Sequence, residues 1–256
     1  MKLVALPAFS DNYIWLLHDG AQAIVVDPGA ASPVIAALDN LGLTLAGILV
    51  THHHDDHVGG LAALRPRLQG PVFGPGRERI PPPFEPVSDG DQVELLGLTF
   101  NVIDVPGHTA GHIAYFLPAH GSDTPILFCG DTLFSAGCGR LFEGTPAQMH
   151  QSLAKLAALP GATRVCCAHE YTESNLRFAA AVEPANAEIA ARISASRALR
   201  AAGQPTLPST IARELAINPF MRCDQAAVIR CAAQRGAADT GGPAVLGALR
   251  EWKNQF

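Results

Sequence analysis

The chain has 256 residues, of which 48% are hydrophobic and 16% charged, so it can bury a large core and has the composition of an ordinary globular protein. Its formal net charge of −5 argues against the broad basic surface that nucleic acid or anionic lipid requires. No run reaches the ~18 apolar residues of a membrane span, and residues 1–7 predict a first strand rather than a signal peptide.

The cysteines have the pattern of an intracellular protein. There are six, and none stands in a C-x-x-C pair. The vicinal pair Cys166-Cys167 stands in an apolar, strand-like run, and we interpret the cysteines as reduced, buried thiols in a cytoplasmic protein.

The first two-thirds of the chain alternates short apolar runs with turn residues. Ser32 and Pro33 predict a helix start, because they supply a capping side chain and a proline in the first turn. Thr145 and Pro146 precede a second stripe of apolar residues at helical spacing. We therefore expect residues 1–171 to form an α/β domain of two sheets with helices outside. The predicted strands are residues 14–17, 23–26, 47–50, 98–102, 113–117, 126–129 and 164–168.

The composition changes after Tyr171. Residues 172–202 are rich in Ala, Glu and Arg and predict helices, and Ser209-Thr210 can cap another one. Residues 233–243 predict a surface loop, and residues 244–254 predict a last short helix. Residues 172–256 are therefore expected to form a small helical domain.

Four of the ten histidines fall within the run Thr51-His52-His53-His54-Asp55-Asp56-His57, directly after apolar residues 48–50. Side chains at i and i+2 of an extended chain point the same way, so His52 and His54 can chelate one metal ion while His53 turns away. Asp56 and His57 are adjacent and can reach a second ion where the chain curves into a helix. A solvated histidine-rich loop is the alternative, and the position after a buried strand disfavours it.

Three further residues of ligand type follow predicted strands in the same way. His108, Asp131 and His169 each stand just past an apolar run, where loops gather into a site. The predicted two-metal site has one set of ligands at His52, His54 and His108, a second at Asp56, His57 and His169, and a bridging carboxylate at Asp131.

This ligand set predicts hydrolysis. Two cations roughly 3.5–4 Å apart can share a hydroxide, lower its pKa toward ~7 and polarise a carbonyl. The predicted nucleophile is this metal-bridging hydroxide, with no side-chain nucleophile. Ligands that are all His and Asp suit Zn(II), Fe(II) or Mn(II) and do not discriminate among these metals. We expect two divalent ions, with Zn(II) first and Fe or Mn as the alternatives. A serine hydrolase would need a G-x-S-x-G elbow, which the sequence lacks.

The remaining histidines and one aspartate have simpler interpretations. His112 opens a predicted strand, so we expect a packed residue. His18, His120 and His150 flank turns or a helix and are expected to face solvent. Asp27 either forms a turn or orients a ligand histidine, and the sequence favours neither alternative.

The motifs together resemble a known superfamily. The T-H-x-H-x-D-H run, the P-G-H-T segment, the G-D-T segment and the later histidine are similar to those of the metallo-β-lactamase superfamily. That resemblance implies a four-layer αββα sandwich with a dinuclear site at one edge, here followed by a small C-terminal helical domain. It does not specify a substrate.

A narrower resemblance covers essentially the whole chain. The segments that carry it are Asp11-Asn12-Tyr13, Gly137-Cys138-Gly139-Arg140-Leu141-Phe142-Glu143-Gly144, Ala168-His169-Glu170-Tyr171-Thr172, Asn218-Pro219-Phe220-Met221-Arg222 and Arg250-Glu251-Trp252-Lys253-Asn254-Gln255-Phe256. They resemble the glyoxalase II family of hydroxyacylglutathione hydrolases. The resemblance implies hydrolysis of the thioester S-D-lactoylglutathione to glutathione and D-lactate, the second step of methylglyoxal detoxification. The seven predicted ligands match that family's metal ligands position by position.

The same resemblance implies that Arg140, Tyr171, Arg250 and Lys253 bind the glutathione part of the substrate. Glutathione carries carboxylates, which an acidic protein can hold only by gathering cations locally. Taken alone, Arg250 and Lys253 would be a solvated pair on one helix face. Some family members have Lys in place of Arg140, so this chain keeps the positive charge but presents a planar guanidinium group. Some have Tyr in place of Phe142, so this chain lacks the hydroxyl group at that position.

Other functions are less consistent with the sequence. One branch of β-lactamases has Cys in place of Asp131 and lacks the helical tail, and a glutathione-persulfide dioxygenase would use one iron and little of the second ligand set. An RNA nuclease would need a basic arm, and a non-catalytic metal-binding module would need no cation pair near the C-terminus. We therefore expect a monomeric cytoplasmic enzyme with a small-molecule substrate and without nucleic-acid or membrane partners.

Overall fold

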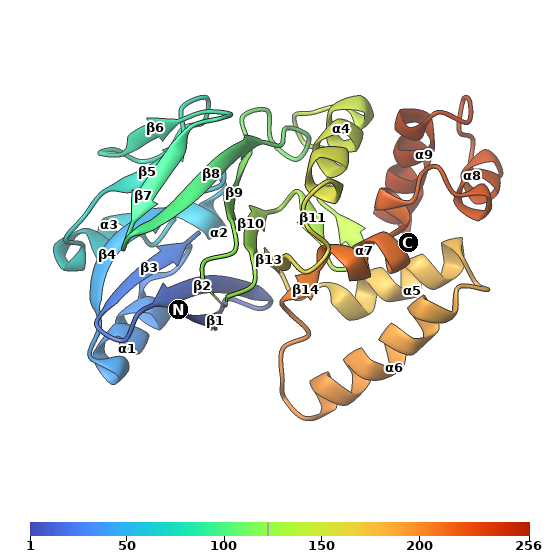
Figure 1. The fold of residues 1–256 in the computed structure, drawn as a ribbon. Helices are drawn as coiled ribbons and strands as arrows, with labels where there is room; N and C mark the ends of the chain where they lie inside the picture. Colours follow the sequence, from blue (N-terminus) through green and yellow to red (C-terminus); the bar gives the residue numbers. More distant parts are fainter. Residues whose placement is uncertain (122) are drawn as a thin grey trace. The chain divides into compact units, whose positions relative to one another are not determined.

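The computed structural model describes residues 1–121 and 123–256, and Figure 1 labels its helices and strands. The chain forms two compact units. The first unit comprises Met1–Asp104 and Ala110–Gly130, and the second comprises Val105–Thr109 and Asp131–Phe256. The sequence-based boundary between residues 171 and 172 divides the chain differently and stays a prediction.

The first unit contains a mixed sheet of six strands. β1 to β3 pair antiparallel, and β3 to β6 pair parallel. β4 ends directly before the histidine-rich run, which places that run at the carboxyl end of a parallel strand. In sheet order the strands are β1 (Lys2–Ala8), β2 (Asn12–His18), β3 (Gln22–Val26), β4 (Thr44–Leu49), β5 (Val72–Pro75) and β6 (Glu85–Val87).

Four further strands of the first unit pair antiparallel in sequence order. They are β7 (Gln92–Leu95), β8 (Leu98–Asp104), β9 (Ile113–Leu117) and β10 (Ile126–Gly130). A Cβ atom at Gly47 of β4 would lie 2.7 Å from the Leu95 side chain of β7. The glycine thus lets the two sheets of this unit approach each other closely.

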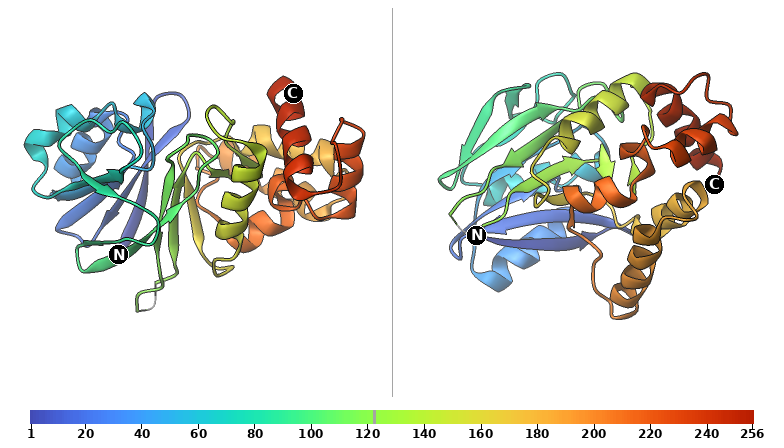
Figure 2. Two further views of the ribbon diagram at one scale, coloured as in Figure 1. Left: turned by 90° about the horizontal axis from the view of Figure 1, so that it is seen from above. Right: turned by 45° about the vertical axis from the view of Figure 1, so that its right-hand side comes forward.

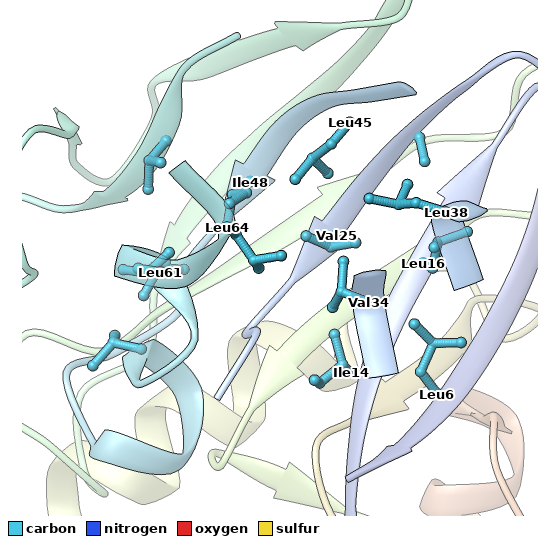
Figure 3. Close-up of a cluster of buried hydrophobic side chains, with 14 of the residues drawn as sticks. Leu6, Ile14, Leu16, Val25, Val34, Leu38, Leu45, Ile48, Leu61 and Leu64 are labelled. Atoms are coloured by element: carbon cyan, nitrogen blue, oxygen red, sulfur yellow. The ribbon is translucent and has the colours of Figure 1, made fainter. Parts of the chain in front are cut away.

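Helices α1 (Ala31–Leu41) and α3 (Leu61–Leu64) cover the six-stranded sheet with apolar side chains. Figure 3 shows Val34 and Leu38 of α1 beside Val25 of β3, with Leu61 and Leu64 of α3 in the same cluster. Each such side chain contributes roughly 1.5–3 kcal/mol when it is fully buried. Between the histidine-rich run and α3 lies the short helix α2 (Asp55–Val58), and a 3₁₀ turn (Arg65–Arg67) follows α3.

The second unit is mainly helical. It contains two short strand pairs, β11 (Leu133–Phe134) with β12 (Gly137–Cys138) and β13 (Arg164–Cys167) with β14 (Ser209–Thr210). Helix α9 packs against α4 and α8, and α5 packs against α6 (Figure 2). The helices are α4 (Pro146–Ala157), α5 (Thr172–Val182), α6 (Ala187–Ala201), α7 (Ile211–Ile217), the 3₁₀ turn Pro219–Met221, α8 (Ala226–Ala233) and α9 (Gly242–Gln255).

Most predicted elements are present, and two details are corrected. Helix α1 begins at Ala31 with Ala30 as its N-cap, so Ser32 lies inside the first turn and does not cap it. Thr145 does cap α4, through a reciprocal capping box with Gln148. His18 is buried, contrary to the expectation that it faces solvent, because it ends β2 between two paired strands.

Some short strands were not predicted. β5 and β6 contain Gly74, Pro75 and Pro86, which are residue types depleted from strands, so no apolar alternation marks them. All six cysteines are free thiols, and five of them are buried, as the sequence predicts. Among the residues that the structure describes, no helix is both long and apolar enough to cross a membrane.

Candidate functional site

The histidine-rich run of the first unit brings two imidazoles together. It starts two residues after the end of β4 and continues into α2, and His54 is the extended N-cap residue of that helix. His52 Nε2 and His54 Nδ1 are 3.1 Å apart. This convergence of i and i+2 side chains is the arrangement that the sequence predicts for one metal ion.

His57 and Asp56 form a second group in the same unit. His57 is fully buried, and its Nε2 lies 3.6 Å from Asp56 Oδ2. Asn12 Nδ2 donates to the same Asp56 oxygen at 2.9 Å. Sequence reasoning gave Asn12 no role at the site, although it belongs to the Asp11-Asn12-Tyr13 segment that carries the family resemblance.

Asp27 lies directly behind this group. It is buried and has a positive φ of 53°, and its carboxylate accepts hydrogen bonds from Thr51 N and Thr51 Oγ1, both at 2.8 Å. Asp27 Oδ2 also lies 3.2 Å from His57 Nδ1. The residue therefore both turns the chain and contacts a predicted ligand on the nitrogen that faces away from Asp56.

The other two histidines near the run face elsewhere. His53 pairs with Glu78 through Nδ1, and Glu78 also accepts from Gly111 N at 2.8 Å. His112 is fully buried and stacks on His52, with ring centroids 4.5 Å apart. His53 thus turns away from His52 and His54, and His112 is packed, as the sequence predicts.

The backbone of Asp56 in α2 packs closely against Gly29. A Cβ atom at Gly29 would overlap the Asp56 carbonyl group, so only glycine fits there. We expect Gly29→Ala to lower the free energy of unfolding by about 1–3 kcal/mol, as overpacking does. Urea unfolding measures this loss. Gly76→Ala is the matched control in the same unit, since its nearest atom would lie at 3.3 Å, and equal stabilities of the two variants would contradict the prediction.

The second unit groups the other three predicted ligands. Asp131 Oδ2 lies 3.4 Å from His108 Nε2, and Asp131 Oδ1 lies 3.3 Å from His169 Nε2. His108 Nδ1 donates to the carbonyl oxygen of Arg140 at 2.8 Å, which assigns the proton to Nδ1 and leaves Nε2 to accept. His169 stacks on Tyr171 with ring centroids 4.7 Å apart.

Both groups fit divalent metal ions by their donor atoms. In the first unit, two imidazole nitrogens converge at 3.1 Å. In the second, one carboxylate turns each of its oxygens toward a different imidazole, as a carboxylate that bridges two cations would. Each set consists of nitrogen and carboxylate donors with hydrogen-bonded groups behind them, which is the usual composition of a catalytic transition-metal site.

A cavity of about 440 Å³ lies within the second unit, beside its predicted ligands. Its walls include all four residues predicted to bind substrate. Sequence reasoning missed Ser174 and Asn175, which belong to the first turn of α5 directly after the Ala168–Thr172 segment. The lining residues are His108, Asp131, Phe134, Cys138, Arg140, Phe142, Tyr171, Ser174, Asn175, Arg250 and Lys253. A more open groove of about 660 Å³ between α5, α6, α7 and α8 contains none of the predicted residues.

The two cations of α9 differ in their surroundings. Arg250 is buried, and its Nη1 donates to Cys138 O at 2.8 Å. Lys253 is partly buried, with Nζ 3.5 Å from Ser174 Oγ. Burial and the nearby cations of Arg250, Arg177 and Arg140 lower the pKa of Lys253 to about 8. Arg250 and Lys253 are therefore not a solvated pair of cations on the surface of α9.

Two of the residues that line the cavity, Phe142 and Arg140, are exposed to solvent. Phe142 is 62% exposed and lies edge-on to His108, with ring centroids 5.3 Å apart. Arg140, two residues earlier, is also exposed. Both side chains are therefore accessible to a ligand that enters from solvent.

Comparison with known proteins identifies the family of this chain. Residues 8–169 match the family described as the metallo-beta-lactamase superfamily, and residues 170–256 match the hydroxyacylglutathione hydrolase C-terminus. The fold and the histidine motif thus define a member of the metallo-β-lactamase superfamily. A relative from Albidiferax ferrireducens named hydroxyacylglutathione hydrolase is 59% identical over 256 residues, which are 100% of both chains. The chain therefore belongs to the hydroxyacylglutathione hydrolase family.

Solved structures agree on the fold. ETHE1 from Myxococcus xanthus is similar, with a TM-score of 0.62, 28% identity, and 86% of this chain and 84% of that chain covered. TTHA1623 in a di-iron-bound form has a TM-score of 0.61 and 26% identity, over 86% of this chain and 100% of that chain. The predicted α/β fold of the metallo-β-lactamase type with a C-terminal helical region is confirmed. This fold and its His and Asp residues together indicate dinuclear metal binding.

Proposed function

We propose that this protein hydrolyses the thioester of 2-hydroxyacylglutathiones, with S-D-lactoylglutathione as the preferred substrate, to glutathione and the free hydroxy acid. The observation that carries the proposal is the cavity of the second unit. It is lined by His108 and Asp131 together with three cationic side chains, in a chain that belongs to the hydroxyacylglutathione hydrolase family.

The metal ligands in this proposal are the seven residues that the sequence predicts. They are His52, His54, Asp56, His57, His108, Asp131 and His169, and they would hold two divalent ions, with Zn(II) as the first expectation and Fe or Mn as alternatives. When bound, such ions lower the pKa of a water molecule and polarise a carbonyl. Asp27 would hold His57 in orientation, and the Arg140 carbonyl would hold His108.

The glutathione part of the substrate would lie against Arg140, Tyr171, Arg250 and Lys253. Glutathione carries two carboxylates, which charge-assisted hydrogen bonds from these cations would recognise. Because Arg250 already donates to Cys138 O, it has fewer donors left for a ligand than the exposed Arg140. Lys253 and Arg140 are therefore the cations best placed to respond to a bound carboxylate.

Two further properties belong to the same proposal. The free, mostly buried thiols favour a reducing compartment, and we place the protein in the cytoplasm on that ground. The net charge of −5 disfavours binding to nucleic acid and to anionic membranes, and we expect neither as a partner. We also expect the protein to be a monomer.

Thiol release tests the substrate directly. The metal-loaded protein is incubated with S-D-lactoylglutathione and, in parallel, with the lactoyl thioester of N-acetylcysteamine, which has the same acyl group and no carboxylates. We expect rapid release of glutathione and slow release of the control thiol. Equal rates would contradict the role of the cationic cavity. Oxygen uptake on glutathione persulfide without thioester hydrolysis would identify a dioxygenase instead.

The lowered pKa of Lys253 predicts a pH dependence of substrate binding. Below pH 8 the ammonium group is charged and attracts a carboxylate, and above it the free protein loses that charge. If binding requires the charged form, KM should rise roughly tenfold by one unit above the pKa. Lys253→Arg keeps its charge at these pH values, so its KM should stay flat between pH 7 and 9. Parallel KM profiles for the two proteins would contradict the assignment.

A further inference from the structure

Residues 131–140, here called the hairpin segment, are held by buried side chains from the helical part of the second unit. Four side chains form hydrogen bonds with backbone atoms of five consecutive residues of this segment. The hydrogen bonds run from Asn218 Nδ2 to Phe134 O (3.1 Å) and Gly137 O (2.9 Å), from Asn175 Nδ2 to Ser135 O (3.1 Å), from Ala136 N to Glu214 Oε2 (2.7 Å) and from Arg250 Nη1 to Cys138 O (2.8 Å).

The hairpin segment depends on these bonds because it has little regular structure of its own. β11 and β12 are two residues long each, and residues 131–139 are all buried. A buried backbone group that loses its hydrogen-bond partner is destabilised, because no water replaces the lost bond. The side chains from the helices therefore decide where this backbone lies.

The hairpin segment carries one predicted metal ligand at its start and holds a second one by a hydrogen bond at its end. Asp131 is its first residue, and the carbonyl oxygen of Arg140, its last residue, accepts the Nδ1 proton of His108 at 2.8 Å. A Cβ atom at Gly139 would overlap the Asp131 carbonyl oxygen and lie 3.0 Å from His108 Nδ1. A small shift of this backbone would thus move both Asp131 and His108.

Asn218 is the central residue of the arrangement. Its side-chain amide donates to both strands of the hairpin, and its Oδ1 accepts from Phe220 N at 3.1 Å. Asn218 is fully buried and does not line the 440 Å³ cavity. Phe220 in turn lies 5.4 Å from the Arg250 guanidinium group, which binds the next residue of the hairpin.

We propose that Asn218 is a positioning residue for metal binding: by holding both strands of the hairpin, it fixes the places of Asp131 and His108. This inference rests on the metal-ligand set of the proposed function. It assigns a role to the Asn218–Arg222 segment, which neither the ligand set nor the substrate cavity uses. The C-terminal helical part is then required for metal affinity as well as for substrate binding.

The test measures Zn(II) affinity in the absence of substrate, by competition of the full-length protein with a chromophoric chelator. Asn218→Ala removes the two bonds to the hairpin. Loss of groups that orient ligands typically costs 10–100-fold in metal affinity, so we expect at least about tenfold weaker binding. In thioester hydrolysis, kcat should fall while KM stays within about twofold.

Asn186→Ala is a matched control. Asn186 also accepts from a helix N-terminus and donates to a backbone carbonyl, Ala216 O at 3.0 Å, in the same unit but away from the hairpin. Urea unfolding of both metal-free variants measures the stability that each loses. If Asn218 only stabilises the fold, both variants will lose stability and both will keep the Zn(II) affinity of the unmodified protein.

Several results separate the alternatives. Weakened Zn(II) binding in Asn218→Ala and unchanged binding in Asn186→Ala would support the inference, whereas equal affinities in both would overturn it. If Asn218→Ala does not fold, Asn175→Ala removes the single bond to Ser135 O, and an unchanged Zn(II) affinity there would also overturn it. An unmodified protein that binds no Zn(II), Fe(II) or Mn(II) would refute the proposed ligand set, and the positioning role with it.

Discussion

Replacing Asp131 with alanine is expected to lower the rate of thioester hydrolysis by about 1000-fold and to reduce the bound metal. Its two carboxylate oxygens face His108 and His169 separately, so no other side chain of the second unit can take over both contacts. Loss of a group that stabilises charge in a transition state costs about 10²–10³ in rate, and here metal binding is weakened as well. Steady-state kinetics and metal analysis on the same preparation measure both effects.

The control for this variant is Asp224→Ala. Asp224 lies in the same unit and carries the same charge, but it is exposed. Removing it should leave rate and metal content unchanged within about twofold, because exposed charges interact weakly through solvent. An Asp131→Ala protein with normal rate and metal content would remove this residue from the ligand set.

Asp56→Ala and Asp55→Ala should differ by about 100-fold in activity, although the residues are neighbours in α2. Asp56 lies 3.6 Å from His57 Nε2 and is held by Asn12, whereas Asp55 is exposed. Only the Asp56 variant loses a predicted ligand, which should leave one metal ion bound and one displaced. Thiol-release kinetics with metal stoichiometry measure the difference.

Asp55→Ala is a matched control for Asp56→Ala. Both variants remove one negative charge from the first turn of the same short helix, so any effect through the helix N-terminus is common to both. If Asp55→Ala lost as much activity as Asp56→Ala, the ligand assignment would have to shift by one residue or be abandoned.

The convergence of His52 and His54 could be predicted from the sequence alone because it is local. His52 and His54 are two positions apart after a buried strand, so their convergence follows from strand geometry. The apolar runs of β2, β3 and β4 likewise mark buried strands directly. Asp131 and His169 could be predicted only by their position after such runs, since nothing local shows which loops meet.

Other features depend on tertiary contacts that no local pattern encodes. Arg250 stands on a helix face that would be solvated in isolation, and only the packing of α9 and the nearby hairpin explains its burial. The contact between Asn12 and Asp56 joins residues 44 positions apart. Family resemblance marked both segments in the sequence, but their hydrogen bonds became apparent only in the structure.

The central claim is that two metal ions, held by the seven predicted ligands, are needed for thioester hydrolysis. Titration of the metal-free protein with Zn(II), with glutathione release from S-D-lactoylglutathione followed at each addition, tests this claim most directly. We predict that the rate rises until two equivalents are bound and returns to background when a chelator removes them. Full activity at one equivalent, or activity that persists in the metal-free protein, would contradict the claim.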